Sequence, residues 1–119
     1  MIEIWLNPSC SKCRVAQREL KASGVAYTVR RYLDQPPSVS EIEDVLRRLG
    51  LEPWDLARTT DAKRLGLTLP ARDASERKAW THLMSENPRL IQRPILTASD
   101  GTTVVGRDAE SLARVIDAG

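Results

Sequence analysis

Residues 7–14 read NPSCSKCR and hold the only two cysteines of the 119-residue chain. Cys10 and Cys13 are separated by two residues, and they follow closely on the apolar run IEIWL of residues 2–6. Isoleucine and leucine alternate with other residues along that run, which predicts a short strand. An Asn-Pro pair then predicts a turn, so both thiols lie where a strand passes into the next element.

The residues after the cysteine pair predict a helix and a second strand. Residues 11–23 are rich in helix formers and precede a glycine, which is typical of a helix closed in the left-handed conformation. Cys13 shares one face of this helix with Ala16 and Leu20. Residues 25–32, VAYTVRRY, again alternate apolar and polar positions. A strand, a helix and a strand of these lengths favour parallel pairing of the two strands.

The remainder of the chain predicts a helical stretch, then a hairpin and a last helix. Proline and glycine punctuate residues 51–74, where we expect loops and short helical turns. The other expected elements are a helix capped at Ser38 or Ser40 and ending at Leu49, a helix from 74 or 75 to 86 that buries Trp80, Leu83 and Met84, strands over 95–98 and 102–105, and a helix over 108–117.

The order of elements is βαβ, a helical insertion at about 36–90, and ββα. This is the plan of an α/β protein with a thioredoxin-like fold. We expect a single domain over residues 1–119, because a chain of this size buries a core without disulfides or metals as staples.

The composition does not indicate a nucleic-acid-binding or a membrane protein. The 18 basic residues outnumber the 16 acidic ones by only two and are spread along the chain, which does not indicate a nucleic-acid partner. No apolar run approaches the roughly 20 residues of a membrane span, and the N-terminus shows no signal-peptide pattern. We therefore expect a cytoplasmic protein without a membrane partner. In that compartment a Cys-x-x-Cys pair is more often catalytic, redox-sensing or metal-binding than a permanent bridge.

The position of Cys10 predicts a reactive thiol. A helix that begins near Ser11 places Cys10 at its N-terminal edge, where unpaired N–H groups and the positive end of the dipole favour a thiolate. Cys13 lies one helical turn further on, at the spacing that lets one thiol attack a bond made by the other. Lys12 and Arg14 are close enough in sequence to add positive charge, although long side chains on a helix often point to solvent.

A metal site is not expected. Structural zinc sites need four protein ligands and catalytic ones need three, whereas this chain offers two cysteines and one histidine, His82. We assign His82 no role and expect no metal cofactor.

Arg93-Pro94 is a further candidate, because it stands directly before a predicted strand. A proline opens a strand in either the cis or the trans form, and the local sequence leaves both open. In thioredoxin-like folds a cis proline lies beside the first cysteine.

Over essentially its whole length, the chain resembles the arsenate reductase family of thioredoxin-like proteins. NPSCSKCR resembles the cysteine loop of that family, and NPRLIQRPIL at 87–96 resembles its stretch before the third strand. Further matches are RRYLDQPPS at 30–38 and LGL at 65–67.

The resemblance implies an enzyme that reduces arsenate to arsenite. Cys10 is then the nucleophile that forms a thiol-arsenate adduct. Guanidinium groups suit the substrate, because they are planar, always charged and able to donate to two oxygens at once. The residues implied to bind the oxyanion are Arg58, Arg93 and Arg107, and the supporting residues are Asn7 and Ser9, which shape the anion loop and cap the helix, with Arg14 and Pro94.

The resemblance leaves the electron donor open. Family members that depend wholly on glutathione lack a partner for the nucleophilic cysteine, whereas this chain has Cys13. Either Cys13 attacks the adduct and thioredoxin reduces the resulting disulfide, or glutathione attacks it and a glutaredoxin completes the cycle. No cofactor beyond these external thiols is expected.

Two other functions remain open. Spx-type transcription regulators resemble this chain in fold, carry a CxxC in the same place as a redox switch, and act by binding RNA polymerase. They continue past the fold in a charged tail, whereas this chain ends at Gly119 and has Arg107, so we expect an enzyme. A glutaredoxin-like reductase of another substrate is the second alternative, and the short spacing between Arg58 and LGL suits it.

Overall fold

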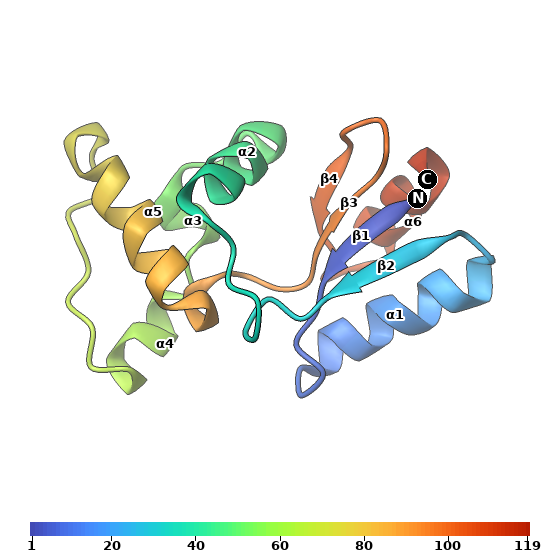
Figure 1. The fold of residues 1–119 in the computed structure, drawn as a ribbon, viewed down its shortest axis with the longest axis horizontal. Helices are drawn as coiled ribbons and strands as arrows, with labels where there is room; N and C mark the ends of the chain where they lie inside the picture. Colours follow the sequence, from blue (N-terminus) through green and yellow to red (C-terminus); the bar gives the residue numbers. More distant parts are fainter. The chain divides into compact units, whose positions relative to one another are not determined.

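The computed structural model describes the whole chain, Met1–Gly119. Its contacts divide the chain into two compact units. The first unit joins Met1–Gln35 to Arg93–Gly119, and the second is Pro36–Gln92. In Figure 1 the blue and red ends of the chain form the first unit, and the colours between them form the second. The insertion expected at about 36–90 lies within the second unit, and the single-domain expectation stays a prediction.

The first unit is built on a four-stranded sheet with the strand order β2-β1-β3-β4. The strands are β1 Ile2–Trp5, β2 Tyr27–Arg30, β3 Ile95–Thr97 and β4 Thr103–Val105. β1 pairs in parallel with β2, while β3 pairs antiparallel with both β1 and β4. The parallel pair and the hairpin are thus the ones that the sequence pattern predicts.

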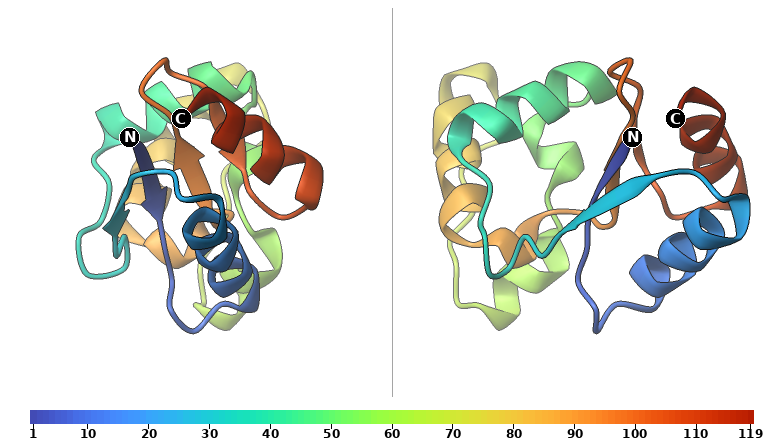
Figure 2. Two further views of the ribbon diagram at one scale, coloured as in Figure 1. Left: turned by 90° about the vertical axis from the view of Figure 1, so that its right-hand side faces the viewer. Right: turned by 45° about the vertical axis from the view of Figure 1, so that its right-hand side comes forward.

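Two helices cover one face of this sheet. They are α1, Ser11–Ser23, and α6, Ala109–Ala118, and they lie side by side (Figure 2). The predicted bounds of α1 are confirmed, and Gly24 closes the helix at φ 76°. The buried core of this unit consists of Ile2, Ile4, Leu6, Cys13, Ala16, Leu20, Leu96, Ala98, Val104, Leu112 and Val115.

The second strand is shorter than the alternating pattern over 25–32 predicts. β2 lies at the edge of the sheet, and its last residue pairs with the last residue of β1. Beyond it the chain turns, because the amides of Asp34 and Gln35 donate to the Arg31 carbonyl at 3.0 and 2.9 Å. The apolar alternation therefore continues into a turn that no longer pairs with the sheet.

The second unit is helical, with α2 Val39–Leu49, α3 Pro53–Leu56, α4 Thr59–Arg64, η1 Ala74–Glu76, α5 Arg77–Glu86 and η2 Pro88–Leu90. Ser38 caps α2 through a reciprocal pair: its hydroxyl accepts from the Glu41 amide at 3.1 Å, and Glu41 accepts from the Ser38 amide at 3.0 Å. Ser38, not Ser40, is therefore the cap. None of the helices has the length and apolar composition that a membrane-spanning helix requires.

The buried face of α5 differs by one residue from the prediction. Trp80 and Met84 are buried as expected, whereas Leu83 is only half-buried. Thr81 takes its place on the buried face, and its hydroxyl donates to the Lys78 carbonyl at 3.0 Å within the helix. A polar residue is tolerated there because its hydrogen bond is satisfied locally.

Gly106 follows β4 at a position without room for a side chain. A Cβ atom there would lie 2.5 Å from Leu96 Cδ1 and 2.9 Å from Leu112 Cδ2, and both leucines are buried. We expect Gly106→Ala to lower the free energy of unfolding by about 1–3 kcal/mol, because the core must shift to admit the methyl group. Urea unfolding followed by circular dichroism measures this change.

The control for that measurement is Ala113→Ser, on the exposed side of α6. We expect it to stay within about 0.5 kcal/mol of the parent protein. Equal effects of the two substitutions would contradict the close packing around Gly106.

Candidate active site

A tight loop joins β1 to α1 and carries the first cysteine. The Asn7 side-chain oxygen accepts a hydrogen bond from the Ser9 amide at 3.0 Å, and the Asn7 carbonyl accepts one from the Cys10 amide at 2.9 Å. Asn7 therefore shapes the loop. The expectation that Asn7 or Ser9 caps the helix is wrong, because Cys10 itself occupies the cap position, with no side-chain cap.

The surroundings of Cys10 favour its thiolate. Burial opposes ionisation, but hydrogen bonds from the Cys13 amide and the Arg93 side chain outweigh it and lower the pKa of Cys10 to about 7. The Cys13 thiol and the Lys12 amide donate to the same sulfur. Free amides at a helix start and an adjacent guanidinium are the two features that produce reactive cysteines. Near neutral pH, a large share of Cys10 is therefore ionised.

Cys13 lies in the opposite environment. Its side chain is buried in the core, and this burial raises the pKa of Cys13 to about 12. The Asn7 amide donates to its sulfur at 3.5 Å and partly offsets that effect, whereas the negative charge of Cys10 adds to it. Cys13 thus keeps its proton beside an ionised neighbour. Two like groups with pKa values pushed apart are typical of an acid–base or nucleophilic site.

The peptide carbonyls of Arg93 and Pro94 hold the chain that follows β4, including the Arg107 side chain. The Arg93-Pro94 bond is cis, which settles the choice that the sequence left open. The Arg93 carbonyl accepts from Arg107 Nη1 at 2.7 Å, and the Pro94 carbonyl accepts from the Gly106 amide at 2.9 Å. The Arg93 side chain reaches Cys10. The structure therefore places Arg93 beside Cys10 and ties Arg107 to the Arg93 carbonyl, and the roles of both arginines as oxyanion ligands stay predictions.

The other charged residues near the cysteines have different contacts. Arg14 is exposed and donates from Nη1 to the Pro8 carbonyl at 3.3 Å, so it supports the loop. Lys12 is also exposed and acts on Cys10 through its amide. No group of three or more histidine, cysteine or acidic side chains is arranged to hold a metal ion, and His82 lies on the surface.

Arg58, the third implied arginine, belongs to the second unit. It directly precedes α4, and its Nε donates to Asp61 Oδ2 at 2.9 Å in a largely buried ion pair. Its amide donates to the Leu90 carbonyl. Within its own unit Arg58 is thus well fixed, and its role as an oxyanion ligand stays a prediction.

The sequence reasoning missed one residue, Tyr32, which lies in the turn after β2. Its side chain is only 1% exposed. Burial raises the pKa of Tyr32 to about 12, and the charges of Arg93, Cys13 and Cys10 also act on its hydroxyl. The hydroxyl therefore belongs to the electrostatic surroundings of the two thiols. The only sequence signal was its place in RRYLDQPPS, one of the stretches that resemble the arsenate reductase family.

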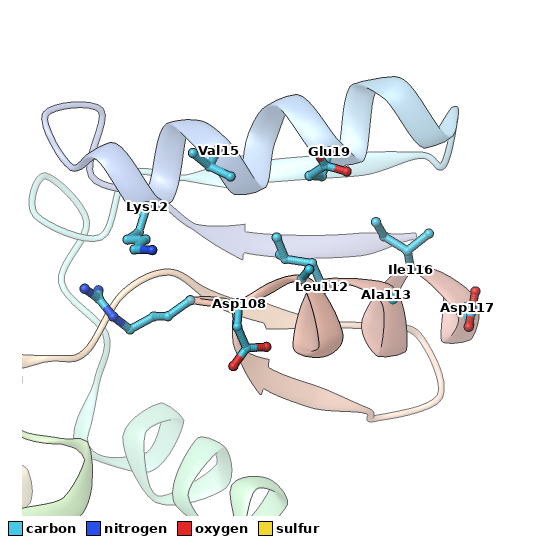
Figure 3. Close-up of a pocket in the computed structure, with 11 residues that line it drawn as sticks. Lys12, Val15, Glu19, Asp108, Leu112, Ala113, Ile116 and Asp117 are labelled. Carbon is cyan, nitrogen blue, oxygen red and sulfur yellow. The ribbon is translucent and has the colours of Figure 1, made fainter.

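A groove of about 470 Å³ runs beside the site between α1 and α6. In Figure 3, Val15 of α1 and Leu112 and Ile116 of α6 line it with apolar groups. Lys12 and Arg107 belong to its lining as well. The groove is therefore accessible from solvent, and Arg107 forms part of its wall.

The sheet order, the cysteine pair at the start of α1 and the cis proline before β3 define a thioredoxin-like protein. The chain belongs to the ArsC family, whose sequence model matches residues 5–115.

Relatives with similar sequences support this assignment. A Streptomyces viridochromogenes protein, described as uncharacterized and located in the glnII region, is 58% identical over 113 residues, which are 93% of this chain and 95% of the relative. The arsenate reductase of Neisseria meningitidis serogroup A is 38% identical over 97% of both chains. The solved arsenate reductase of Vibrio cholerae has a TM-score of 0.77 at 32% identity and covers 96% of both chains. An Spx regulator of Oceanobacillus iheyensis is also among the relatives.

The pKa of Cys10 predicts how its reactivity depends on pH. We expect alkylation by iodoacetamide to rise through about pH 7, because the thiolate is the nucleophile. Arg93→Gln removes a hydrogen bond to the thiolate, so the pKa rises and alkylation at pH 6 falls by roughly tenfold. Mass spectrometry identifies the alkylated residue and follows the rate.

Arg18→Gln, on the exposed side of α1, is the control for this measurement. It should leave the alkylation rate unchanged within about twofold. An Arg93→Gln profile that matches the parent would show that Arg93 does not stabilise the thiolate.

Proposed function

We propose that this protein is a thiol-dependent arsenate reductase. The observation that carries the proposal is the Cys10 sulfur, which has a pKa of about 7 and accepts a hydrogen bond from Arg93. A thiolate attacks an oxyanion only when the negative charge of the anion is neutralised, and arginines are suited to that task. The arsenate reductases among the relatives support arsenate as the substrate.

In the first step, the Cys10 thiolate attacks arsenic(V). A sulfur–arsenic bond forms and an arsenic–oxygen bond breaks, and the departing oxygen takes up protons and leaves as water. Arsenic keeps its oxidation state in this step. Arg93 and Arg107 hold the remaining oxygens, and Arg58 is the third proposed ligand.

In the second step, another thiolate attacks the Cys10 sulfur. A disulfide forms, the sulfur–arsenic bond breaks, and its electron pair stays on arsenic, which leaves as arsenite. Two thiols are thereby oxidised and arsenic gains two electrons. We propose Cys13 as the attacking thiol, because it interacts with the Cys10 sulfur. The adduct removes the Cys10 charge that helps to raise the pKa of Cys13, which favours loss of its proton at that stage.

The oxidised pair then needs an external reductant. Thioredoxin is the donor that fits an internal disulfide, because its own dithiol exchanges with such a bond. Glutathione with a glutaredoxin is the other donor, and in that case glutathione attacks the adduct in place of Cys13. No resident cofactor enters either cycle.

A redox-responsive regulator of the Spx type is the second candidate function. The observation that favours it is the same interacting thiol pair, since a switch also needs one reactive and one resolving cysteine. Turnover with arsenate separates the two, because a regulator has no need of an oxyanion substrate.

Replacement of the cysteines tests the mechanism. Cys10→Ser should abolish arsenate-dependent NADPH consumption in an assay coupled to thioredoxin and thioredoxin reductase, and equally in one coupled to glutathione and glutaredoxin. Cys13→Ser should stop the first assay. It leaves the second active if glutathione resolves the adduct. If Cys10→Ser turned over arsenate at nearly the parental rate, the mechanism would be wrong. If the parent showed no arsenate-dependent turnover in either assay, the regulator would be the favoured function.

Arg93→Lys tests oxyanion binding by the guanidinium. Lysine keeps the charge but loses the planar pair of donors, so we expect kcat/KM for arsenate to fall by roughly tenfold or more. Arg18→Lys, on the exposed face of α1, is the matched control and should retain full activity. Equal activity of the two variants would mean that Arg93 does not hold the substrate.

A further inference from the structure

Tyr32 lies where the first two strands end. The Leu6 amide donates to the Arg30 carbonyl at 2.9 Å, which ties the end of β2 to the chain just before the cysteine loop. Two residues later comes Tyr32, inside the turn that closes on the Arg31 carbonyl. The carboxyl ends of parallel strands meet at one edge of a sheet, and in α/β proteins ligands bind at that edge. The backbone alone thus places Tyr32 beside the cysteine loop.

The side chain of Tyr32 is buried, in contrast to its neighbours in the turn. Arg31 and Asp34 are exposed and pair with each other at 3.4 Å, whereas Tyr32 is 1% exposed. Its hydroxyl donates to no acceptor in the structure. A buried hydroxyl without a partner destabilises a fold, so such groups are rare and tend to mark functional sites.

The hydroxyl donates a hydrogen bond to none of the groups around it. Arg93 acts on it, but a guanidinium carries only donors. Cys13 and Cys10 act on it through their charges, but the hydroxyl donates a hydrogen bond to neither sulfur. The hydroxyl stays protonated near neutral pH, because its pKa is raised to about 12. The hydroxyl is therefore a neutral hydrogen-bond donor without an acceptor, close to Cys10 and Arg93.

We propose that the Tyr32 hydroxyl donates a hydrogen bond to an oxygen of the oxyanion bound at Cys10. This assignment rests on the proposed function. An arsenate oxygen supplies an acceptor for a hydroxyl that donates to none in the resting site, and the acceptor carries negative charge, which makes the bond strong. Tyr32 would thus be a substrate-binding residue that adds a neutral donor to the charged donors of the arginines.

The test compares Tyr32→Phe with Tyr27→Phe, the only other tyrosine of the chain. Each substitution removes one hydroxyl and keeps the ring. Both are made in a Cys13→Ser background without added thiols, so that no disulfide forms. The readout is the arsenate concentration that half-protects Cys10 from iodoacetamide. We expect it to rise roughly tenfold in Tyr32→Phe and to stay unchanged in Tyr27→Phe.

Two further readouts separate substrate binding from a structural role. Thermal unfolding of Tyr32→Phe should have the same or a higher midpoint, because the buried hydroxyl donates to no acceptor in the resting protein. The alkylation rate of Cys10 without arsenate should stay within about twofold of the parent rate. A lower midpoint, a failure to fold or a changed basal rate would show a structural role and overturn the assignment.

The protection experiment also distinguishes the two proposals from each other. Equal protection of the parent and of Tyr32→Phe by arsenate would overturn the role of Tyr32 and leave the oxyanion site intact. No protection of the parent at any arsenate concentration would overturn the oxyanion site, and the role of Tyr32 with it.

Discussion

The carbonyl groups of Arg93 and Pro94 hold the site together. They accept hydrogen bonds from the Arg107 side chain and the Gly106 amide, so the chain before β3 is fixed to the chain after β4. β3 also pairs with β1, the strand that leads into the cysteine loop. The positions of both arginines and of Cys10 therefore derive from the hydrogen-bonded backbone of one sheet. A site built on regular elements keeps its geometry better than one built on loops alone.

The two thiols show how one helix start produces two chemical states. Cys10 stands before the first turn of α1, where amides and Arg93 donate to its sulfur. Cys13 is one turn further along and points into the core, where burial dominates. Three residues of separation are enough to move a side chain from the edge of a helix to its buried face. The same residue type thus has a lowered pKa at the edge of the helix and a raised pKa on its buried face.

Local sequence signals predicted most of the fold and failed where tertiary contacts decide. α1 and the capping box at Ser38 were predictable, because their signals lie within a few residues of the elements they end. The end of β2 was not, since the alternating pattern continues into an unpaired turn. Motifs predicted Cys10 and the arginines as site residues, and their roles stay predictions. Tyr32 was missed, because no local pattern tells a buried hydroxyl without a partner from an ordinary core tyrosine.

The stabilised thiolate of Cys10 also affects how readily a Cys10–Cys13 disulfide accepts electrons from a partner dithiol. A disulfide between Cys10 and Cys13 would, on reduction, release a thiolate that the protein stabilises, and every such interaction makes the disulfide a stronger oxidant. The pair would therefore accept electrons readily from a partner dithiol. Below about pH 7 the reduced Cys10 takes up a proton and this contribution fades. The backbone amides and Arg93 that prepare the nucleophile would thus also favour its regeneration.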